Sequence, residues 1–201
     1  SLTYYTVSDN LFYYPIQNDS TKETLHKISN LKDGKLNIAT YSIFMQKDIA
    51  KWWAVTFNGA VNFNSFNGAI DGSVYSGSSF PYYFYLNNRF ILPKKWTIEL
   101  GAIYWSGYLA GLYHNKDKSA VNFAVRKSVL KGKLNISFGV NDIFYTQINR
   151  STVSYQNQNT SLRSTFDSRR YTIGLNYSFG KVKVQQRKTK SNEEEKARLT
   201  H

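Results

Sequence analysis

The amino-acid sequence predicts an all-β fold, an antiparallel up-and-down transmembrane β-barrel with about eight strands in this chain. Three observations lead to this fold class. Apolar and polar residues alternate along most of the chain, the connections between the alternating segments switch between short and long, and the polar positions hold mostly small, uncharged residues. A strand with lipid on one side and a lumen on the other has this pattern.

The alternation is strictest in residues 171–179. Its polar positions are Thr172, Gly174, Asn176 and Ser178. None of them carries a charge, and the apolar side ends in two aromatic residues. We therefore predict a membrane-spanning strand here.

Seven earlier segments alternate in a similar way, and most are close to the roughly 9 to 11 residues of a membrane-spanning strand. They are residues 2–7, 36–46, 53–64, 80–92, 96–105, 121–126 and 134–141. Residues 36–46 fit two registers, and we expect Tyr41, Ile43 and Met45 to face outward. In residues 80–92, Asn88 interrupts the apolar side.

The alternation assigns side chains to two surfaces of the barrel wall. The predicted lipid-facing residues are Val55, Phe57, Ile98, Leu100, Phe123, Ile136, Phe138, Ile173 and Leu175. The predicted lumen-facing residues are Thr56, Asn58, Asn62, Glu99, Arg126, Asn135 and Arg170. The lumen-facing set is small for the interior of a closed eight-stranded barrel, so it suits the wall of a wider barrel.

The connections alternate in length. Residues 48–51, 93–95 and 130–133 are predicted tight turns, whereas residues 8–34, 67–79, 107–118 and 148–168 are long and polar. Outer-membrane barrels have short periplasmic turns and long outer loops. This topology sends the last strand toward the periplasm.

Composition restricts the function classes. The net charge is +13, but the basic residues gather in residues 181–201, in turns and in loops, so we expect solvated charges and no nucleic-acid partner. We divide the chain into a barrel part, residues 1–180, and a basic periplasmic tail, residues 181–201, which we predict to be disordered. The chain contains no cysteine, which excludes disulfides and thiolate chemistry. Because it opens at Ser1 without an apolar leader, we expect a processed or excised piece of an exported protein.

A soluble eight-stranded barrel would show the same alternation with the faces exchanged. Its polar face would then meet water and carry roughly 25–35% charged residues. The polar side here has few charges, and aromatic residues gather at strand ends, as they do at the two surfaces of a bilayer. The membrane interpretation is therefore favoured, with the soluble barrel kept as an alternative.

The sequence contains no recognisable catalytic, cofactor-binding or metal-binding motif. The three histidines are far apart, and His114 with Asp117 is interpreted as a solvated loop pair. The inward charges Arg89, Glu99, Arg126 and Arg170 are interpreted as a ladder across neighbouring strands, the alternative being contact with a solute or a plug. We expect neither an enzyme nor a cofactor.

The last strand is similar to a known terminal-strand signal. The outer-membrane assembly machinery recognises the pattern polar, any, Gly, any, any, aromatic, any, aromatic. Thr172, Gly174, Tyr177 and Phe179 match this pattern in register. The resemblance implies that the chain is a client of the barrel-assembly machinery.

A second resemblance involves residues 140–146, VNDIFYT. Asn141, Asp142 and Phe144 match an element in the second-to-last strand of TonB-dependent receptors. With its KWW and LPKKW turns, its DSRR segment and its Tyr-Ser-Phe-Gly ending, the chain resembles the C-terminal strands of the TonB-dependent-receptor-like outer-membrane barrel family over residues 1–180.

This resemblance implies a location in the outer membrane of a Gram-negative bacterium and uptake of a solute. Members of the family have a barrel of about 22 strands and a plug that contacts the TonB system; the plug and most of the barrel strands would precede the segment seen here. The implied partners are outer-membrane lipid, the assembly machinery, an unidentified solute and, through the plug, TonB. The alternatives are a complete small eight-stranded barrel with a structural or adhesive role, in which the strand near Tyr4 pairs with the one near Leu175, and an outer-membrane enzyme.

Overall fold

The structure, a computed structural model, describes residues 1–9, 11–30, 32–70, 73–156 and 158–179. Within these ranges the regular structure is β-strand with two short 3-10 turns, η1 (Pro93–Lys95) and η2 (Leu130–Gly132). The strands are β1 (Leu2–Ser8), β2 (Leu11–Gln17), β3 (Thr24–Asn30), β4 (Lys32–Ala50), β5 (Trp53–Ile70), β6 (Ser73–Ser79), β7 (Tyr82–Leu92), β8 (Trp96–Trp105), β9 (Tyr108–Ala110), β10 (Tyr113–Asn115), β11 (Lys118–Val129), β12 (Leu134–Asn141), β13 (Asn149–Tyr155), β14 (Gln158–Ser164) and β15 (Arg170–Tyr177). In the described ranges, no helix has the length and apolar character needed to cross a membrane.

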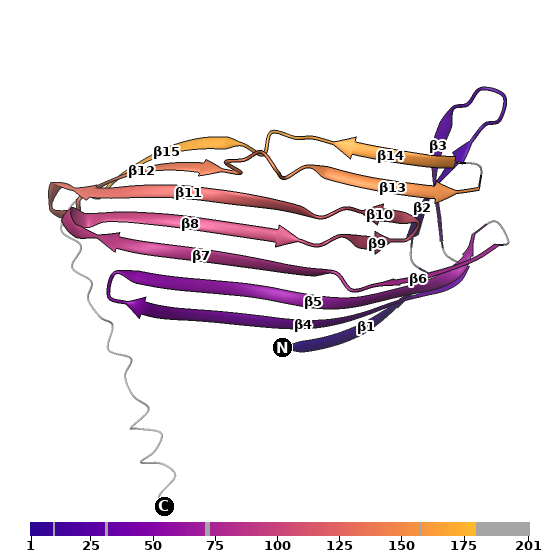
Figure 1. The fold of residues 1–201 in the computed structure, drawn as a ribbon, viewed down its shortest axis with the longest axis horizontal. Helices are drawn as coiled ribbons and strands as arrows, with labels where there is room; N and C mark the ends of the chain where they lie inside the picture. The colour runs from indigo at the N-terminus through magenta and orange to yellow at the C-terminus, as the bar shows by residue number, and fades with distance from the viewer. Residues whose placement is uncertain (10, 31, 71–72, 157, 180–201) are drawn as a thin grey trace, which may run out of the picture.

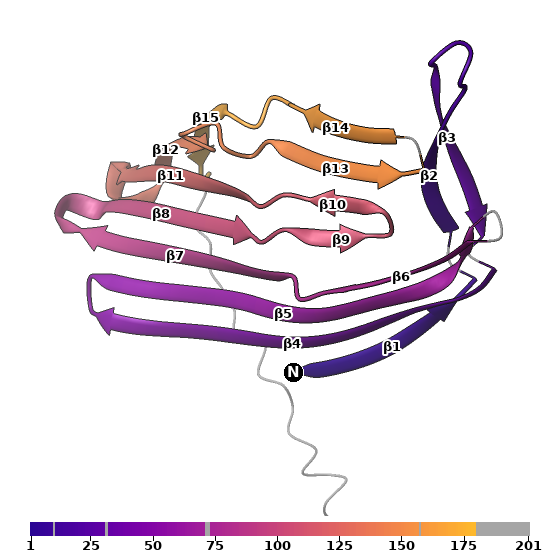
Figure 2. The same cartoon turned by 45° about the vertical axis from the view of Figure 1, so that its right-hand side comes forward.

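One antiparallel sheet forms most of the molecule. Its order is β1-β4-β5-β7-β8-β11-β12-β15, and β6 also pairs with β5, beyond the point where β7 does (Figure 1). The sheet is curved, and its two edge strands do not meet (Figure 2). Among the described strands, β1 pairs with β4 alone and β15 with β12 alone.

The predicted all-β, up-and-down fold is confirmed. The three predicted tight turns lie together at one end of the sheet, which we call the turn side, and the long connections lie at the other end, the loop side (Figure 1). Lys94 in η1 and Lys131 in η2 have φ values of 58° and 56°, the left-handed backbone that so short a reversal requires.

The long connections contain more regular structure than the alternation analysis predicts. The strands β4 and β5 are 19 and 18 residues long: β4 extends the predicted segment 36–46 at both ends, to Lys32–Ala50, and β5 continues past residue 64 to Ile70. The other connections fold as the hairpins β2–β3, β9–β10 and β13–β14, and β10 and β13 join the last two into a four-stranded sheet. Pairing satisfies backbone groups that a polar loop would otherwise leave to water.

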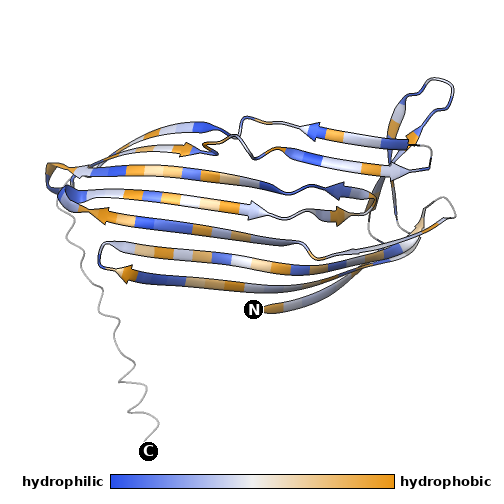
Figure 3. Ribbon diagram, in the orientation of Figure 1, coloured by the Kyte–Doolittle hydropathy of each residue, from blue (hydrophilic) through white to orange (hydrophobic). Residues whose placement is uncertain are grey.

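The sheet has two chemically different faces, and the strand register keeps them separate. On the apolar face, Met45 lies opposite Phe57, and Phe57 lies opposite Leu86. The same face continues through Leu100 opposite Phe123 to the far edge. The other surface, the polar face, carries the intervening residues, and hydropathy alternates along the strands accordingly (Figure 3). Tyr41, Ile43 and Met45 lie on the apolar face, as the favoured register predicts, because Tyr41 lies opposite Val61. That this face points outward stays a prediction.

Aromatic residues cluster at the turn side. Trp52, Trp53 and Phe90 stack with ring centroids 6.1 to 6.3 Å apart. The indole N–H of Trp53 donates to Oδ1 of Asn88 over 3.0 Å, which explains the one polar residue that interrupts the apolar side of β7. A bilayer surface suits such rings, because it offers water to the polar edge and hydrocarbon to the ring.

Candidate functional site

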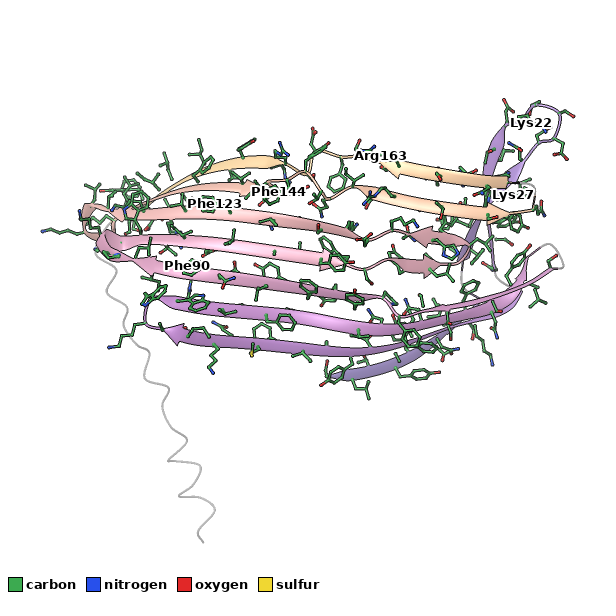
Figure 4. The ribbon with its side chains drawn as sticks, in the orientation of Figure 1. Lys22, Lys27, Phe90, Phe123, Phe144 and Arg163 are labelled. Carbon is green, nitrogen blue, oxygen red and sulfur yellow. The ribbon has the colours of Figure 1, made fainter. Side chains whose placement is uncertain are left out.

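The first hairpin, β2–β3, packs against other loop-side segments. Phe12 and Tyr14 of β2 are buried with Val153 and Tyr155 of β13. The rings of Tyr14 and Tyr155 meet edge to face at 5.7 Å. Alternation within β2 places Phe12 and Tyr14 on the same side of the hairpin, so a two-stranded element gains an apolar core from its neighbours. Figure 4 labels Lys22 and Lys27 on this hairpin, at the end of the molecule opposite Phe90.

The hairpin contacts the polar face of the main sheet. Phe12 lies 5.9 Å from the ring of Phe66, measured between centroids. Phe66 lies on β5 opposite Leu36 and Gly77, and it shares its face with Asn58 and Asn62. The loop-side end of the polar face is therefore apolar and is covered by the hairpin.

A cavity of about 430 Å³ lies between the hairpin and the wall. Its lining comes from β2, β4, β5, β6, β9 and β10, and includes Phe12, Ile38, Asn64, Phe66 and Leu109. The volume falls in the range of about 300–1,000 Å³ typical of small-molecule pockets.

A hydrogen bond holds the hairpin to the loop sheet. Nδ1 of His26 in β3 lies 3.0 Å from the hydroxyl oxygen of Tyr113 in β10. Burial raises the pKa of the Tyr113 hydroxyl, so this group stays protonated at neutral pH and can donate. The bond crosses between two long connections, and it helps to fix the cavity's shape.

A second organised site on the loop side is centred on Asp142, directly after β12. The Asp142 side chain is 1% exposed. Its Oδ1 accepts from the Thr146 amide at 2.9 Å and from the Thr146 hydroxyl at 3.2 Å; its Oδ2 accepts from the Gln147 amide at 3.0 Å and from the Ser168 hydroxyl at 2.7 Å. This carboxylate ties the segment after β12 to the segment before β15.

The backbone around Asp142 is also fixed. Its φ is 45°, in the left-handed region, and its amide donates to Oδ1 of Asn122 over 2.9 Å. Burial would raise the pKa of the carboxyl, but the hydrogen bonds from Ser168, Thr146 and Gln147 outweigh it and hold the pKa below its usual value. Asp142 is therefore an anionic clasp, a buried carboxylate that joins the nearby residues Thr146 and Gln147 to the distant Ser168.

The structure brings the predicted wall residues onto the two faces. All nine predicted lipid-facing residues lie on the apolar face, where Phe138 lies opposite Ile173 and Ile136 opposite Leu175. All seven predicted lumen-facing residues lie on the polar face: Thr56, Asn58, Asn62, Glu99, Arg126, Asn135 and Arg170. Contact with lipid or lumen stays a prediction.

The inward charges occupy neighbouring strands. Arg89 and Glu99 lie directly opposite each other in the β7–β8 register. Arg126 lies opposite Thr97, which is on the same face of β8 as Glu99. Arg170 lies opposite Asn141, at the β15 edge of the sheet. The register therefore brings Arg89 and Glu99 side by side, and the charge ladder itself stays a prediction.

The predicted assembly signal lies along and just beyond β15. The rings of Tyr177 and Phe179 meet edge to face at 4.6 Å, and Phe179 is 85% exposed. Gly174 has no side chain to collide with Ser137, whose Oγ would lie 2.5 Å from a Cβ built there. Glycine at this point therefore allows close β12–β15 pairing.

His114 and Asp117, the predicted loop pair, are both exposed. His114 is exposed on β10, and Asp117 accepts from the Tyr104 hydroxyl over 3.4 Å. Within the described ranges, no group of three or more His, Cys, Asp and Glu side chains is placed to hold a metal ion.

Comparison with known proteins decides the family. The profile of the outer membrane protein beta-barrel family matches residues 1–177, almost the whole described chain. The chain belongs to this outer-membrane β-barrel family. No curated protein and no solved structure matches the sequence or the fold significantly.

Membership of the outer-membrane β-barrel family places the protein in the outer membrane, as the sequence predicts. Family membership does not establish the number of strands in the barrel or a link to TonB, so both stay predictions. The predicted periplasmic tail, residues 181–201, lies outside the described residues.

Sequence reasoning missed the cavity and the core of the first hairpin. The segment Leu11–Gln17 places Phe12, Tyr14 and Ile16 on one side, a period-two signal that could have identified β2. The cavity had no such signal, because Asn64, Phe66 and Leu109 meet only through the folding of three separate connections.

Proposed function

We propose that this outer-membrane β-barrel takes up a solute in the manner of TonB-dependent receptors, with this chain supplying wall, outer loops and assembly signal rather than a catalytic centre. The observation that carries the proposal is the open sheet. Its eight-strand path ends at β1 and β15, which are not paired with each other. Unpaired backbone groups in hydrocarbon each cost several kcal/mol, so a membrane wall of this kind needs further strands to close.

The polar face supports a wide lumen. Its residues include Thr56, Ala60, Gly101, Ser137 and Gly139, which are too small to fill the interior of a closed barrel. A wider barrel leaves room for water or for a plug. The resemblance of residues 140–146 to TonB-dependent receptors favours the plugged arrangement, with outer-membrane lipid, the assembly machinery, an unknown solute and TonB as partners.

Disulfide trapping tests the barrel size, and the absence of native cysteine in this chain makes the experiment direct. In the whole protein in outer membranes, Asn135→Cys with Asn176→Cys joins register partners and should cross-link on oxidation. Cross-links should not form between β1 and β15, which are not paired with each other. The pairs that test this combine Thr3→Cys or Tyr5→Cys with Thr172→Cys or Asn176→Cys. A cross-link between β1 and β15 would instead establish the small closed barrel with a structural or adhesive role.

Energy coupling needs a separate measurement. The purified periplasmic domain of TonB should bind the whole protein in lipid nanodiscs, as measured by calorimetry. Empty nanodiscs provide the control. If TonB does not bind but disulfide trapping shows a wide barrel, the chain still forms part of a large barrel wall, and TonB-dependent uptake is rejected.

The assembly signal gives a further expected result. Phe179→Ala removes an 85%-exposed ring that pairs with Tyr177, and it should lower the amount of folded protein in outer membranes several-fold. Phe44→Ala is the matched control, because Phe44 is also exposed, at 66%, but lies on β4 away from the terminal strand. Folded protein is measured by heat-modifiable gel mobility; equal yields for both variants would contradict a signal role for Phe179.

A further inference from the structure

A lysine lies on the apolar face at the turn side. Lys127 of β11 lies directly between its register partners, Trp96 of β8 and Ile136 of β12. The same row of side chains continues into Leu92 and Leu175. A positive charge on the lipid-facing surface of a barrel is costly at mid-depth of the bilayer and nearly free at its surface. Lys127 therefore marks the level at which lipid headgroups meet the wall.

Two contacts hold the Lys127 ammonium group at the turn side. Nζ lies 4.5 Å from the centroid of the Trp96 ring, and it donates to the backbone carbonyl oxygen of Lys94 in η1 over 2.6 Å. The half-buried stem of Lys127 can lie along its apolar neighbours while the charge reaches the turn. An ammonium group has three N–H donors, so the carbonyl and the ring leave at least one donor for a ligand.

The protein does not neutralise the charge of Lys127. Both contacts are with neutral groups, and among the described residues Nζ has no carboxylate partner. The neighbouring cations, from η1, η2 and the residue after η2, are Lys94, Lys95, Lys131 and Lys133. Because β8 pairs with β11, the two turns lie side by side at one end of the sheet. Residues 91–98 and 127–135 contain no Asp or Glu, so an anion bound here would meet no carboxylate from either segment.

We propose that Lys127, Lys94 and Trp96 form a binding site for the phosphate group of an anionic phospholipid, phosphatidylglycerol, whose acyl chains lie on the apolar face. Short turns of outer-membrane barrels lie at the periplasmic surface, where the leaflet consists of phospholipid. The preference for an anionic headgroup follows from the lysines without carboxylate partners. Phosphatidylethanolamine fits less well, because its own ammonium group would lie among these cations.

The inference goes beyond solute uptake and does not depend on TonB. It rests on the apolar face meeting lipid, which Leu86→Arg at mid-strand tests separately. Failure of the lipid site would leave the disulfide and TonB measurements untouched.

Lipid binding is measured by native mass spectrometry on the whole protein, purified from outer membranes into detergent. Dioleoyl phosphatidylglycerol and dioleoyl phosphatidylethanolamine are titrated separately, and because their acyl chains are identical, a difference in affinity reports the headgroup. The native protein should bind the first molecule of phosphatidylglycerol more tightly than the first molecule of phosphatidylethanolamine.

Lys127→Gln should lower the affinity for phosphatidylglycerol about tenfold, the effect of losing one hydrogen bond to a charged group, and should bring it close to that for phosphatidylethanolamine. Lys127→Arg keeps the charge and should keep the preference. Heat-modifiable gel mobility shows that each variant is folded before its lipid binding is measured.

Two lysines elsewhere in the wall provide matched controls. Lys118, at the loop-side end of β11, also lies over a tryptophan, with Nζ 5.4 Å from the Trp105 ring centroid, and it donates to Oδ1 of Asn149 over 2.8 Å. Lys47 lies on the apolar face opposite Val55, in the strand end that leads into the third tight turn, and Asp48 follows it directly. Lys118→Gln and Lys47→Gln should each change the affinity for phosphatidylglycerol by less than about twofold.

Three results would overturn the proposal. The first is equal affinity of the native protein for the two lipids. The second is a folded Lys127→Gln variant that keeps the preference for phosphatidylglycerol. The third is an equal loss in Lys47→Gln and Lys127→Gln, which would show that the lipid responds to the summed charge of the turn side and not to a site at Lys127.

Discussion

Asp142→Ala is expected to destabilise the loop side by about 3–5 kcal/mol, because several donors lose one charged acceptor and each hydrogen bond to a charged group contributes about 1.5–3 kcal/mol. The change removes a 1%-exposed carboxylate and leaves the amides of Thr146 and Gln147 without their acceptors. It also frees Ser168, so the connection before β15 loses its link to β12. Hydrogen exchange at these two amides should accelerate by two orders of magnitude or more.

Asp117→Ala is the matched control, because Asp117 is an exposed carboxylate in another loop-side connection whose contact is a 3.4 Å bond from Tyr104. It should change exchange at Thr146 and Gln147 by less than about twofold, as expected of surface substitutions. Equal effects of the two substitutions would show that Asp142 is not a clasp.

The same carboxylate sets a pH dependence. Because hydrogen bonds lower the folded-state pKa of Asp142 below its unfolded value of about 3.9, the stabilisation is fully present above that pH. It is lost as pH falls through the folded-state pKa, when the carboxyl takes up a proton. Asp142→Asn should remove this contribution, so loop-side exchange in the variant should no longer respond to acid in this range.

Leu86→Arg is expected to lower the free energy of unfolding in lipid vesicles by about 2–4 kcal/mol, whereas Asn87→Arg should change it by less than about 1 kcal/mol. Leu86 lies near the middle of β7 on the apolar face, opposite Phe57 and Ala102. Asn87 is its neighbour on the polar face, opposite Thr56 and Gly101. The two positions share one strand and one depth, so only the medium at each face distinguishes them.

Denaturant unfolding of the whole protein provides the measurement. A larger loss for Asn87→Arg than for Leu86→Arg would exchange the two faces, and with them the assignment of lipid and lumen. Equal small losses would mean that neither face meets hydrocarbon.

The faces of the wall could be predicted because period-two alternation is a local property. Val55, Ile98 and Phe138 occupy the apolar face because each strand alternates, and the register between strands then brings like residues opposite one another. Asn88 departs from the alternation because Trp53 supplies its partner from the neighbouring strand, and nothing in its own segment signals that bond.

The sites on the loop side depend on contacts that no local pattern contains. The match of Asn141, Asp142 and Phe144 to a known element marks the position, but the donor from Ser168 lies 26 residues away. Asn64 lines a cavity together with residues of β2, β6 and β9, which come from separate parts of the chain. Folded hairpins within long connections were likewise hidden, since polar composition suggests irregular loops.

The order of the main sheet has a kinetic consequence. Most neighbouring strands of the main sheet follow one another along the chain, so each of these pairings closes a short span of polypeptide and costs little entropy. The β1–β4 and β12–β15 pairings close longer spans, which contain the inserted hairpins. A register slip of one residue in any pair would move the side chains of the slipped strand, and of every strand that pairs after it, to the opposite face of the sheet. Because β4 and β5 are the longest described strands, at 19 and 18 residues, their ladder is the best template for the alignment of all that follow.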